Sequence, residues 1–585
     1  MARELDARPV HTPSSLGAVL RREIVVADVA PFIRFDPKNY VRSPVARGDH
    51  WEIRLLCWRP GQTSTLHGHG TSACAFRVLR GSATESILGS RDRVLAPGDI
   101  VEEDVTDLVH QVGNAGQDPL LTLHLYSPPL PVDAPSLREG RSIVVVGGGF
   151  AGVAVATHLL RRARREEPLR IFLVERGPWL GRGVAYGVES EIFRLNVAAS
   201  RMSLDPEAPN DFVRWASAEE TPHAFLPRTK YGAYVASRFA DALRESSGKL
   251  RVVRGEATHV DEGGVVLASG ARLPAEAVVL ATGIQPRLAP GALPEDARIV
   301  DAWDESALAT LPLTGKLLIL GSGLTALDVL AFLDAQAFSG TATVLSRRGL
   351  LPRPHAPSSR KAEPLSPDAV RELPLTLRAT IAWARRVLGA TVARGDPWQH
   401  GIDAIRPHIP RLWQGLTAED RARFVRSVRP YWDVLRHRAP ADALDLVEAW
   451  QRRGQLVLAA GAIITCRPNG DGLDVEVRGP GGTSRAHRYD AIVRCVGPAL
   501  ERADADTPLV RSLVLGGRAR VDPAGLGIVT DSEGHVITAH GDGDLGGPRV
   551  YAMGALRRAS FWETTSVPDI AVHALAIAKE LLPST

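Results

Sequence analysis

Residues 142–152 read SIVVVGGGFAG, an apolar run that leads through glycines into a second apolar segment. A run of this kind predicts a strand buried on both faces, and the glycine-rich turn predicts that a helix follows. Gly147, Gly149 and Gly152 complete the pattern G-x-G-x-x-G. The first glycine permits a tight turn, the second lets backbone approach a pyrophosphate, and the third allows the helix to pack closely. The stretch therefore predicts a dinucleotide-binding unit that begins near residue 141.

The next strand of this unit is predicted at residues 171–174 and ends at Glu175. An acid at this place can accept hydrogen bonds from the ribose hydroxyls of adenosine. The predicted helix directs its N-terminus at the phosphates. Strand, helix and terminal acid together favour dinucleotide binding over a purely structural glycine turn.

A second unit of the same kind is predicted after the apolar run 316–320. Its next strand, residues 342–345, ends at two arginines instead of an acid, which suits the additional 2′-phosphate of NADPH. A solvated basic turn, with NADH as the cofactor, is the alternative. The residues concerned are Gly321, Gly323 and Ala326 in the glycine turn, and Arg347 and Arg348 at the strand end.

Two dinucleotide-binding folds in one chain suggest a flavoprotein that takes hydride from a nicotinamide cofactor. Two further motifs fit FAD: Ala281-Thr282-Gly283 after an apolar run, and Tyr551-Ala552-Met553-Gly554 near the C-terminus. The region 141–585 resembles an uncharacterised bacterial family of FAD/NAD(P)-binding proteins, distantly similar to flavin N-hydroxylating monooxygenases. The motifs that carry this resemblance are GRGVAYG at 181–187, LNV at 195–197 with Asn196, RMS at 201–203 and PRxxYG at 227–232. The resemblance implies FAD contacts at Asn196, Gly283 and Gly554.

The N-terminal part has a different pattern. Residues 40–130 contain short alternating apolar stretches separated by turns, which predicts a small β-barrel. His67-Gly68-His69 matches the first half of the cupin motif, and two histidines at i and i+2 of a strand point to one face. Cys74 stands where cupins usually place a glutamate ligand, so His110 is the expected third ligand. Three neutral imidazoles would leave a divalent iron with open positions for a thiolate and O₂.

Residues 37–130 resemble cysteine dioxygenase. The resemblance rests on YVR at 40–42, LCW at 56–58, HGH at 67–69, Cys74, His110 and LHLYSPP at 123–129. It implies that His67, His69 and His110 hold Fe(II), and that Arg42 binds the substrate carboxylate. It also implies that Tyr126 lies beside the iron, that His124 hydrogen-bonds this tyrosine, and that Cys74 can form a thioether crosslink with it.

The composition constrains the function classes. The chain has 585 residues, with 70 basic and 66 acidic side chains and a net charge of +4, which does not favour nucleic-acid binding. Its four cysteines include no CxxC pair, so neither a disulfide framework nor a dithiol relay is expected. No apolar stretch predicts a signal peptide or a membrane span, and we expect a cytoplasmic protein.

We therefore expect a multidomain protein with an all-β cupin barrel followed by an α/β, Rossmann-like flavoprotein. The expected boundaries are barrel 1–130, linker 131–140, FAD-binding domain 141–300 and 487–585, and NAD(P)H-binding domain 301–486 with a helical insert at 370–455. The expected partners are a small thiol, foremost cysteine, O₂ and the nicotinamide cofactor.

The reaction that this implies is oxidation of the thiol to a sulfinate, with a flavin half that oxidises the sulfinate to a sulfonate. Alternatives for the flavin half are an amine N-hydroxylase and a simple reductase. For the barrel, the alternative is a cupin that binds metal without turnover. A non-catalytic metal and flavin sensor is the alternative for the whole chain.

Overall fold

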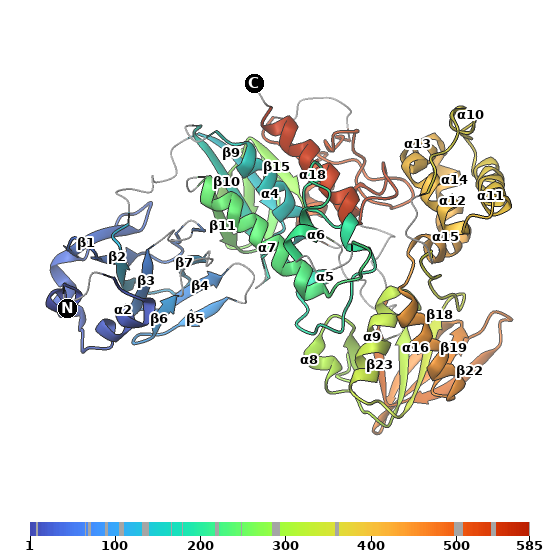
Figure 1. The fold of residues 1–585 in the computed structure, drawn as a ribbon, viewed down its shortest axis with the longest axis horizontal. Coiled ribbons are helices and arrows are strands. Elements are labelled where there is room, and N and C mark those ends of the chain that lie inside the picture. The colour runs from blue at the N-terminus through green and yellow to red at the C-terminus, as the bar shows by residue number, and fades with distance from the viewer. Residues whose placement is uncertain are drawn as a thin grey trace.

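The computed structural model describes residues 1–6, 10–64, 66–67, 72–87, 92–103, 110–130, 140–164, 167–177, 180–216, 222–246, 249–283, 293–356, 362–496, 507–539 and 546–583. The chain forms an N-terminal barrel, two α/β domains and a group of inserted helices (Figure 1). Within the described residues, no helix is long and apolar enough to cross a membrane.

The barrel consists of two antiparallel sheets. The larger has the order β1-β2-β8-β3-β6 and the smaller the order β5-β4-β7. Helix α2 (Pro13–Leu20) packs on the outside of the larger sheet, where its leucines join a hydrophobic core. The strands are β1 (Val41–Arg47), β2 (Glu52–Trp58), β3 (Ala73–Arg80), β4 (Ala83–Ile87), β5 (Arg93–Leu95), β6 (Ile100–Glu103), β7 (His110–Asn114) and β8 (Leu120–Ser127), and the other short helices are α1 (Ala2–Leu5) and α3 (Val26–Val29).

The first α/β domain contains a parallel sheet of order β11-β10-β9-β15-β24. Helices α4, α7 and α18 pack together beside this sheet (Figure 1). Its strands are β9 (Arg141–Val146), β10 (Leu169–Glu175), β11 (Leu250–Arg254), β15 (Ala277–Leu280) and β24 (Arg549–Ala552), with the antiparallel β12 (Ala257–Asp261), β13 (Gly264–Leu267) and β14 (Arg272–Pro274). Its helices are α4 (Phe150–Arg162), α5 (Gly183–Tyr186), α6 (Asp211–Ala216), α7 (Arg228–Glu245), α17 (Pro508–Leu515) and α18 (Val567–Leu581).

The second α/β domain has a parallel sheet of order β16-β23-β17-β18-β19. Strand β23 pairs with β17, so the second domain extends beyond the expected boundary at residue 486. The short apolar strand β23 follows the separate antiparallel sheet β20–β22 and pairs with β16 and β17. The strands are β16 (Ile299–Asp301), β17 (Lys316–Leu320), β18 (Thr341–Ser346), β19 (Leu456–Ala460), β20 (Ala462–Asn469), β21 (Gly472–Arg478), β22 (Ser484–Tyr489) and β23 (Ala491–Arg494), and the helices are α8 (Glu305–Leu308), α9 (Leu324–Ala335) and α16 (Ala441–Arg452).

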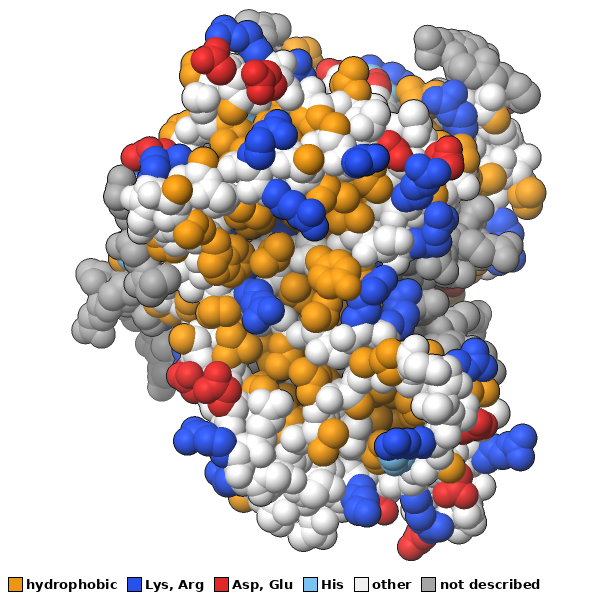
Figure 2. Space-filling model, turned by 90° about the vertical axis from the view of Figure 1, so that its right-hand side faces the viewer, with side chains coloured by type: hydrophobic (Ala, Val, Ile, Leu, Met, Phe, Trp, Pro, Cys, Tyr) orange, Lys and Arg blue, Asp and Glu red, His pale blue; other side chains and the backbone are white. Residues whose placement is uncertain are grey.

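The inserted helices leave the second domain after β18. They share a hydrophobic core with Leu526 and Trp562 of the first domain, whereas α16 at the end of the expected insert packs on α9. Figure 2 shows the side of the molecule that lies on the right in Figure 1, where hydrophobic side chains gather in the middle among Lys and Arg. The helices are α10 (Pro367–Arg371), α11 (Leu377–Ala393), α12 (Trp398–Ile405), α13 (Ile409–Gly415), α14 (Ala418–Arg423) and α15 (Arg429–Arg436).

The barrel lies against the outer edge of the first parallel sheet, where β11 is the last strand (Figure 1). The side-chain amide of Gln111 donates to the carbonyl oxygen of Val252 (2.9 Å) and accepts from the amide of Val252 (3.1 Å). Arg251 donates to the hydroxyl of Thr63 (3.0 Å), and Leu66 belongs to the hydrophobic core of the first α/β domain. Buried polar and apolar contacts therefore join the two parts.

Candidate functional sites

His67 and His110 come together through backbone pairing. The amide of each residue donates to the carbonyl oxygen of the other, at 2.8 and 2.9 Å. Residues that face each other in this way on antiparallel segments direct their side chains to the same side. The two imidazole centroids lie 5.0 Å apart. His69 lies outside the described residues, and within these no group of three metal-binding side chains is assembled.

Glu85 of β4 orients one of these rings. Its Oε1 lies 2.6 Å from Nδ1 of His110, and both side chains are buried, with 0% and 1% exposure. The other carboxylate oxygen accepts from Arg93. A carboxylate on Nδ1 leaves Nε2 of His110 as the nitrogen for a metal. Glu85 was not identified from the sequence; the available signal was that it is the single ionisable residue of the short strand β4.

A column of polar side chains runs along β8 inside the barrel. The Tyr126 hydroxyl lies 3.2 Å from Nδ1 of His124, and Nε2 of His124 lies 3.0 Å from the hydroxyl of Thr122. Burial lowers the pKa of His124 well below its usual value and raises that of Tyr126 well above its own. Both groups are therefore neutral at pH 7.

Cys74 of β3 lies directly opposite Tyr126 of β8 in the antiparallel ladder. Side chains of such pairs share a face and have Cβ atoms about 4.5–5.5 Å apart. Both residues are buried. The register therefore places the sulfur beside the tyrosine ring.

Arg42 of β1 faces the same interior. Its Nε donates to the Tyr40 hydroxyl (2.8 Å), and its charge acts on the pKa values of both His124 and Tyr126. A guanidinium oriented by a neighbouring phenol can hold a carboxylate. The barrel interior thus brings together two expected metal ligands and the expected carboxylate-binding arginine. It also contains the side chains of Cys74, His124 and Tyr126.

The glycine turn after β9 has the shape of a pyrophosphate cradle. Gly147 has φ +106°, and a Cβ at this position would overlap the carbonyl oxygen of Ala281. The nearest atom to a Cβ added at Gly149 is 3.5 Å away, so space is open there. Glu175 accepts from the amide of Gly148 (2.6 Å), which places its carboxylate beside the turn. The residues present therefore fit a dinucleotide.

Of the other expected FAD contacts, two follow strands β15 and β24 of the same sheet, and the third lies elsewhere. Gly283 and Gly554 both have positive φ, and a Cβ at either would meet no atom within 4 Å. β15, which ends before Gly283, pairs with β9 and β24. The carbonyl oxygen of Asn196 accepts from Nε2 of His355 (3.1 Å). Asn196 lines a cavity and does not lie in the glycine turn.

The glycine turn of the second α/β domain has similar geometry. Gly321 has φ +107°, and a Cβ there would overlap the carbonyl oxygen of Cys495, whereas Gly323 faces open space. Ala326 is buried in α9. Arg347 is exposed, and the guanidinium of Arg348 lies 5.2 Å from the ring centroid of Tyr431 in α15. Two arginines at this strand end fit a 2′-phosphate.

A cavity of about 400 Å³ lies between the first α/β domain and the inserted helices. This cavity could not be identified from the sequence, because its walls come from distant segments. Burial and the charge of Arg438 lower the pKa of His355 in its wall to about 4, so this imidazole is neutral at pH 7. The lining includes Asn196, Arg201, His355, His400, Asp403, Arg406, Arg436, Arg438 and Ser566.

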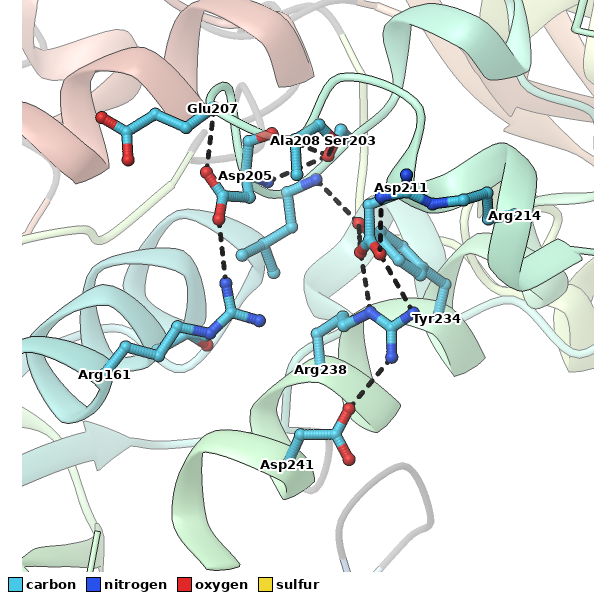
Figure 3. A network of polar contacts seen from close by, with 12 residues as sticks. Arg161, Ser203, Asp205, Glu207, Ala208, Asp211, Arg214, Tyr234, Arg238 and Asp241 are labelled. Atoms are coloured by element: carbon cyan, nitrogen blue, oxygen red, sulfur yellow. Dashed lines mark hydrogen bonds and ion pairs between the residues drawn. The ribbon is translucent and has the colours of Figure 1, made fainter. Parts of the chain in front are cut away.

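Figure 3 shows polar contacts that fix residues 203–211, the segment that follows Arg201 of the cavity wall. The hydroxyl of Ser203 donates to the carbonyl oxygen of Asp205 (2.8 Å), and Arg161 of α4 donates to the carboxylate of Asp205 (3.1 Å). A few residues further, the carboxylate of Asp211 accepts two bonds from Arg238 of α7 (2.7 and 3.2 Å). Ser203 of the RMS motif thus helps to anchor this segment.

Comparison with protein families gives two separate matches. A family model described as cysteine dioxygenase type I matches residues 22–134, and one described as FAD-NAD(P)-binding matches residues 144–285. Cysteine dioxygenase type 1 of Danio rerio is 32% identical over 116 residues, which are 17% of this chain and 58% of the relative. The Homo sapiens protein is 30% identical over 113 residues, 17% of this chain and 56% of the relative. The chain thus spans just over half the length of these relatives.

Solved structures match the remainder of the chain. An ornithine N-hydroxylase from Kutzneria sp. 744 has a TM-score of 0.51 at 14% identity, over 76% of this chain and 99% of that one. A cadaverine monooxygenase from Erwinia amylovora also has a TM-score of 0.51 at 14% identity, over 76% and 95%. At this identity the likeness concerns the fold alone. The N-terminal part of the chain thus resembles cysteine dioxygenase, and the rest resembles FAD- and NAD(P)-binding proteins and has the fold of flavin-dependent monooxygenases.

Proposed function

We propose that the chain is a bifunctional oxidoreductase. Its barrel oxidises a small thiol, foremost cysteine, to the sulfinate, and its flavin region uses NADPH and O₂ to oxidise that product to the sulfonate. The observation that carries the proposal is the convergence of His67, His110, Tyr126 and Arg42 inside one barrel. A barrel that only bound metal would have less need of the last two side chains.

In the barrel, His67 and His110, with His69, would hold Fe(II), which supplies a site for the thiolate and O₂. Glu85 would hold the His110 ring in position through its Nδ1. Arg42 would bind the carboxylate of the substrate and so orient its sulfur. Tyr126, protonated at pH 7, would donate a hydrogen bond to the reacting oxygen atoms, with His124 holding its hydroxyl.

In the flavin region, FAD would bind with its pyrophosphate at Gly147 and Gly149, its ribose at Glu175, and contacts to Gly283, Gly554 and Asn196. NADPH would bind at Gly321 and Gly323, with its 2′-phosphate at Arg347 and Arg348. The flavin supplies hydride acceptance and O₂ activation. The protein would position the cofactors at the helix N-termini and exclude water from the reacting atoms.

The two reactions balance as follows. In the first, both atoms of O₂ are added to the thiol sulfur and the thiol proton is released. In the second, the sulfinate gains one oxygen atom from O₂, NADPH supplies two electrons, and the other oxygen atom leaves as water with two protons. The contact between barrel and flavin sheet supports sequential use of one metabolite, because a joined pair of sites raises the local product concentration.

The test is mass spectrometry of the products formed by purified protein from cysteine, NADPH and O₂. Sulfinate and sulfonate are expected from the wild type. His67→Ala should abolish both products and keep the flavin spectrum. In Gly149→Ala the added methyl group has room, since its nearest neighbour is 3.5 Å away, but it takes the place of the pyrophosphate. This variant should make sulfinate without sulfonate and lose bound FAD.

Two results would each contradict a different part of the proposal, the first reaction or the second. Sulfinate formation that persists in His67→Ala would remove the iron assignment. Sulfinate without any sulfonate from the wild type, with full FAD occupancy, would remove the second reaction and leave the first.

A further inference from the structure

The cavity between the first α/β domain and the inserted helices is dominated by guanidinium groups. Arg201 comes from the segment after α5, whereas Arg406, Arg436 and Arg438 come from the inserted helices and the residues after them. Because arginine remains charged at all physiological pH values, these four groups bring four positive charges to one cavity of about 400 Å³.

Three of the arginines already have carboxylate partners. Arg406 lies 3.1 Å from Asp569, Arg436 lies 3.0 Å from Glu563, and Arg438 contacts Asp403. Arg201, an exposed residue that lines the cavity, has no ion pair with any described residue; desolvation and the neighbouring arginines lower its pKa, whereas Asp403 raises it. The cavity therefore has one positive charge more than its carboxylates balance.

Hydrogen-bond donors in the same walls also lack partners. Nε of Arg436 and Nε of Arg438 are buried and have no hydrogen-bond acceptor among the described residues. The two residues are 9% and 6% exposed. His400 is 6% exposed, and its Nε2 is likewise unpaired within the described part of the chain. Buried polar groups are almost always hydrogen-bonded, so these atoms point to an acceptor that a ligand brings.

From the excess charge and the unpaired donors together, we propose that the cavity binds a small organic acid through its carboxylate, sulfinate or sulfonate oxygens. Arg201 is the guanidinium that pairs with the acid, and the unpaired donors of Arg436, Arg438 and His400 donate to its oxygens. The inference rests on the proposed function in one respect: the sulfinate that the barrel makes belongs to this class. A protonated amine would meet like charge in this cavity.

One face of the molecule also carries many basic side chains. On the side of the molecule in Figure 2, Lys and Arg are spread more widely than Asp and Glu. A positive field of this kind raises the encounter rate of small anions and is weakened by salt. This face and the cavity therefore favour ligands of the same charge.

The test is equilibrium binding to the full-length, FAD-loaded, oxidised protein, measured by isothermal titration calorimetry without NADPH. The probes are cysteine sulfinate, aspartate and the diamine cadaverine. Both acids should bind, more weakly at high salt, and the diamine should not. Arg201→Gln should weaken binding of both acids about tenfold or more, which is the usual effect of losing a charge-assisted hydrogen bond.

Arg520→Gln is the matched control. Arg520 is exposed and, like Arg201, makes no ion pair with a described residue, so the substitution removes the same charge without touching the cavity. Acid binding should be unchanged in this variant. Arg201→Lys keeps the charge but lacks the planar guanidinium, so it should bind the acids with intermediate affinity. This variant serves as the test if the glutamine variant is unstable.

Equal acid affinities in wild type and both Arg201 variants would overturn the inference, and so would binding of cadaverine in preference to the acids. Because no turnover is needed, its failure is separable from that of the proposed function. Sulfonate production with no Arg201-dependent binding removes this inference alone. Acid binding without sulfonate production removes the second reaction alone.

Discussion

Replacing Glu85 with glutamine should weaken iron binding while leaving the barrel folded. Its carboxylate is fully buried and lies 2.6 Å from Nδ1 of His110. Loss of such a partner to a metal-binding histidine typically reduces metal affinity by about 10–100-fold. The glutamine has the same shape and can still accept the Nδ1 proton, but it loses the negative charge. We therefore expect the lower end of that range, about tenfold or ~1.4 kcal/mol.

The assay is competition for Fe(II) between the protein and a chelator of known affinity, followed by sulfinate formation at limiting and at excess iron. Activity of Glu85→Gln should be low at limiting iron and recover when iron is added. Glu52→Gln is the control, because Glu52 is also buried in the barrel but pairs with Arg54 (3.0 Å). Unchanged iron affinity in Glu85→Gln, or an equal loss in both variants, would refute the reasoning.

Three further predictions concern other parts of the chain. If Cys74 and Tyr126 form a thioether, the peptide pair that contains them should be lighter by two hydrogen atoms, and Cys74→Ser should abolish this mass difference. Gly152→Ala should lower the melting temperature and FAD content, because its Cβ would overlap the carbonyl oxygen of Gly147; unchanged values would contradict the packing argument. Burial raises the pKa of Asp328 to about 6, above its unfolded value near 3.8, although Arg228 pairs with the carboxylate (2.9 Å), so stability should fall as pH rises through this window. Denaturant unfolding should show this slope in the wild type and a flatter profile in Asp328→Asn.

The sequence alone was sufficient to predict those parts of the fold that depend on residues close together in the chain. The glycine turns at Gly147 and Gly321 were predictable because the glycine pattern that permits their positive φ lies within a few adjacent residues, although the residues that approach these turns, Ala281 and Cys495, are distant in the sequence. The cupin barrel and the Rossmann-like architecture followed from the periodicity of apolar residues, and the comparisons confirm both.

The rest depended on contacts between distant segments. Glu85 reaches His110 only because β4 and β7 pair, and nothing in the local sequence specifies that pairing. Arg201 and Arg436 enter one cavity although more than two hundred positions separate them. The placement of β23 in the second sheet also follows from long-range strand order, which short apolar runs do not determine.

The bond between Gln111 and Val252 has a consequence for anyone who divides this chain. An unprotected outermost strand offers its amides and carbonyls to any other extended peptide, which is a common route to aggregation. Here one side chain from the neighbouring barrel blocks that strand. A flavin fragment cut at the linker would expose it. We expect such a fragment to aggregate in solution, whereas the barrel covers this strand in the intact chain.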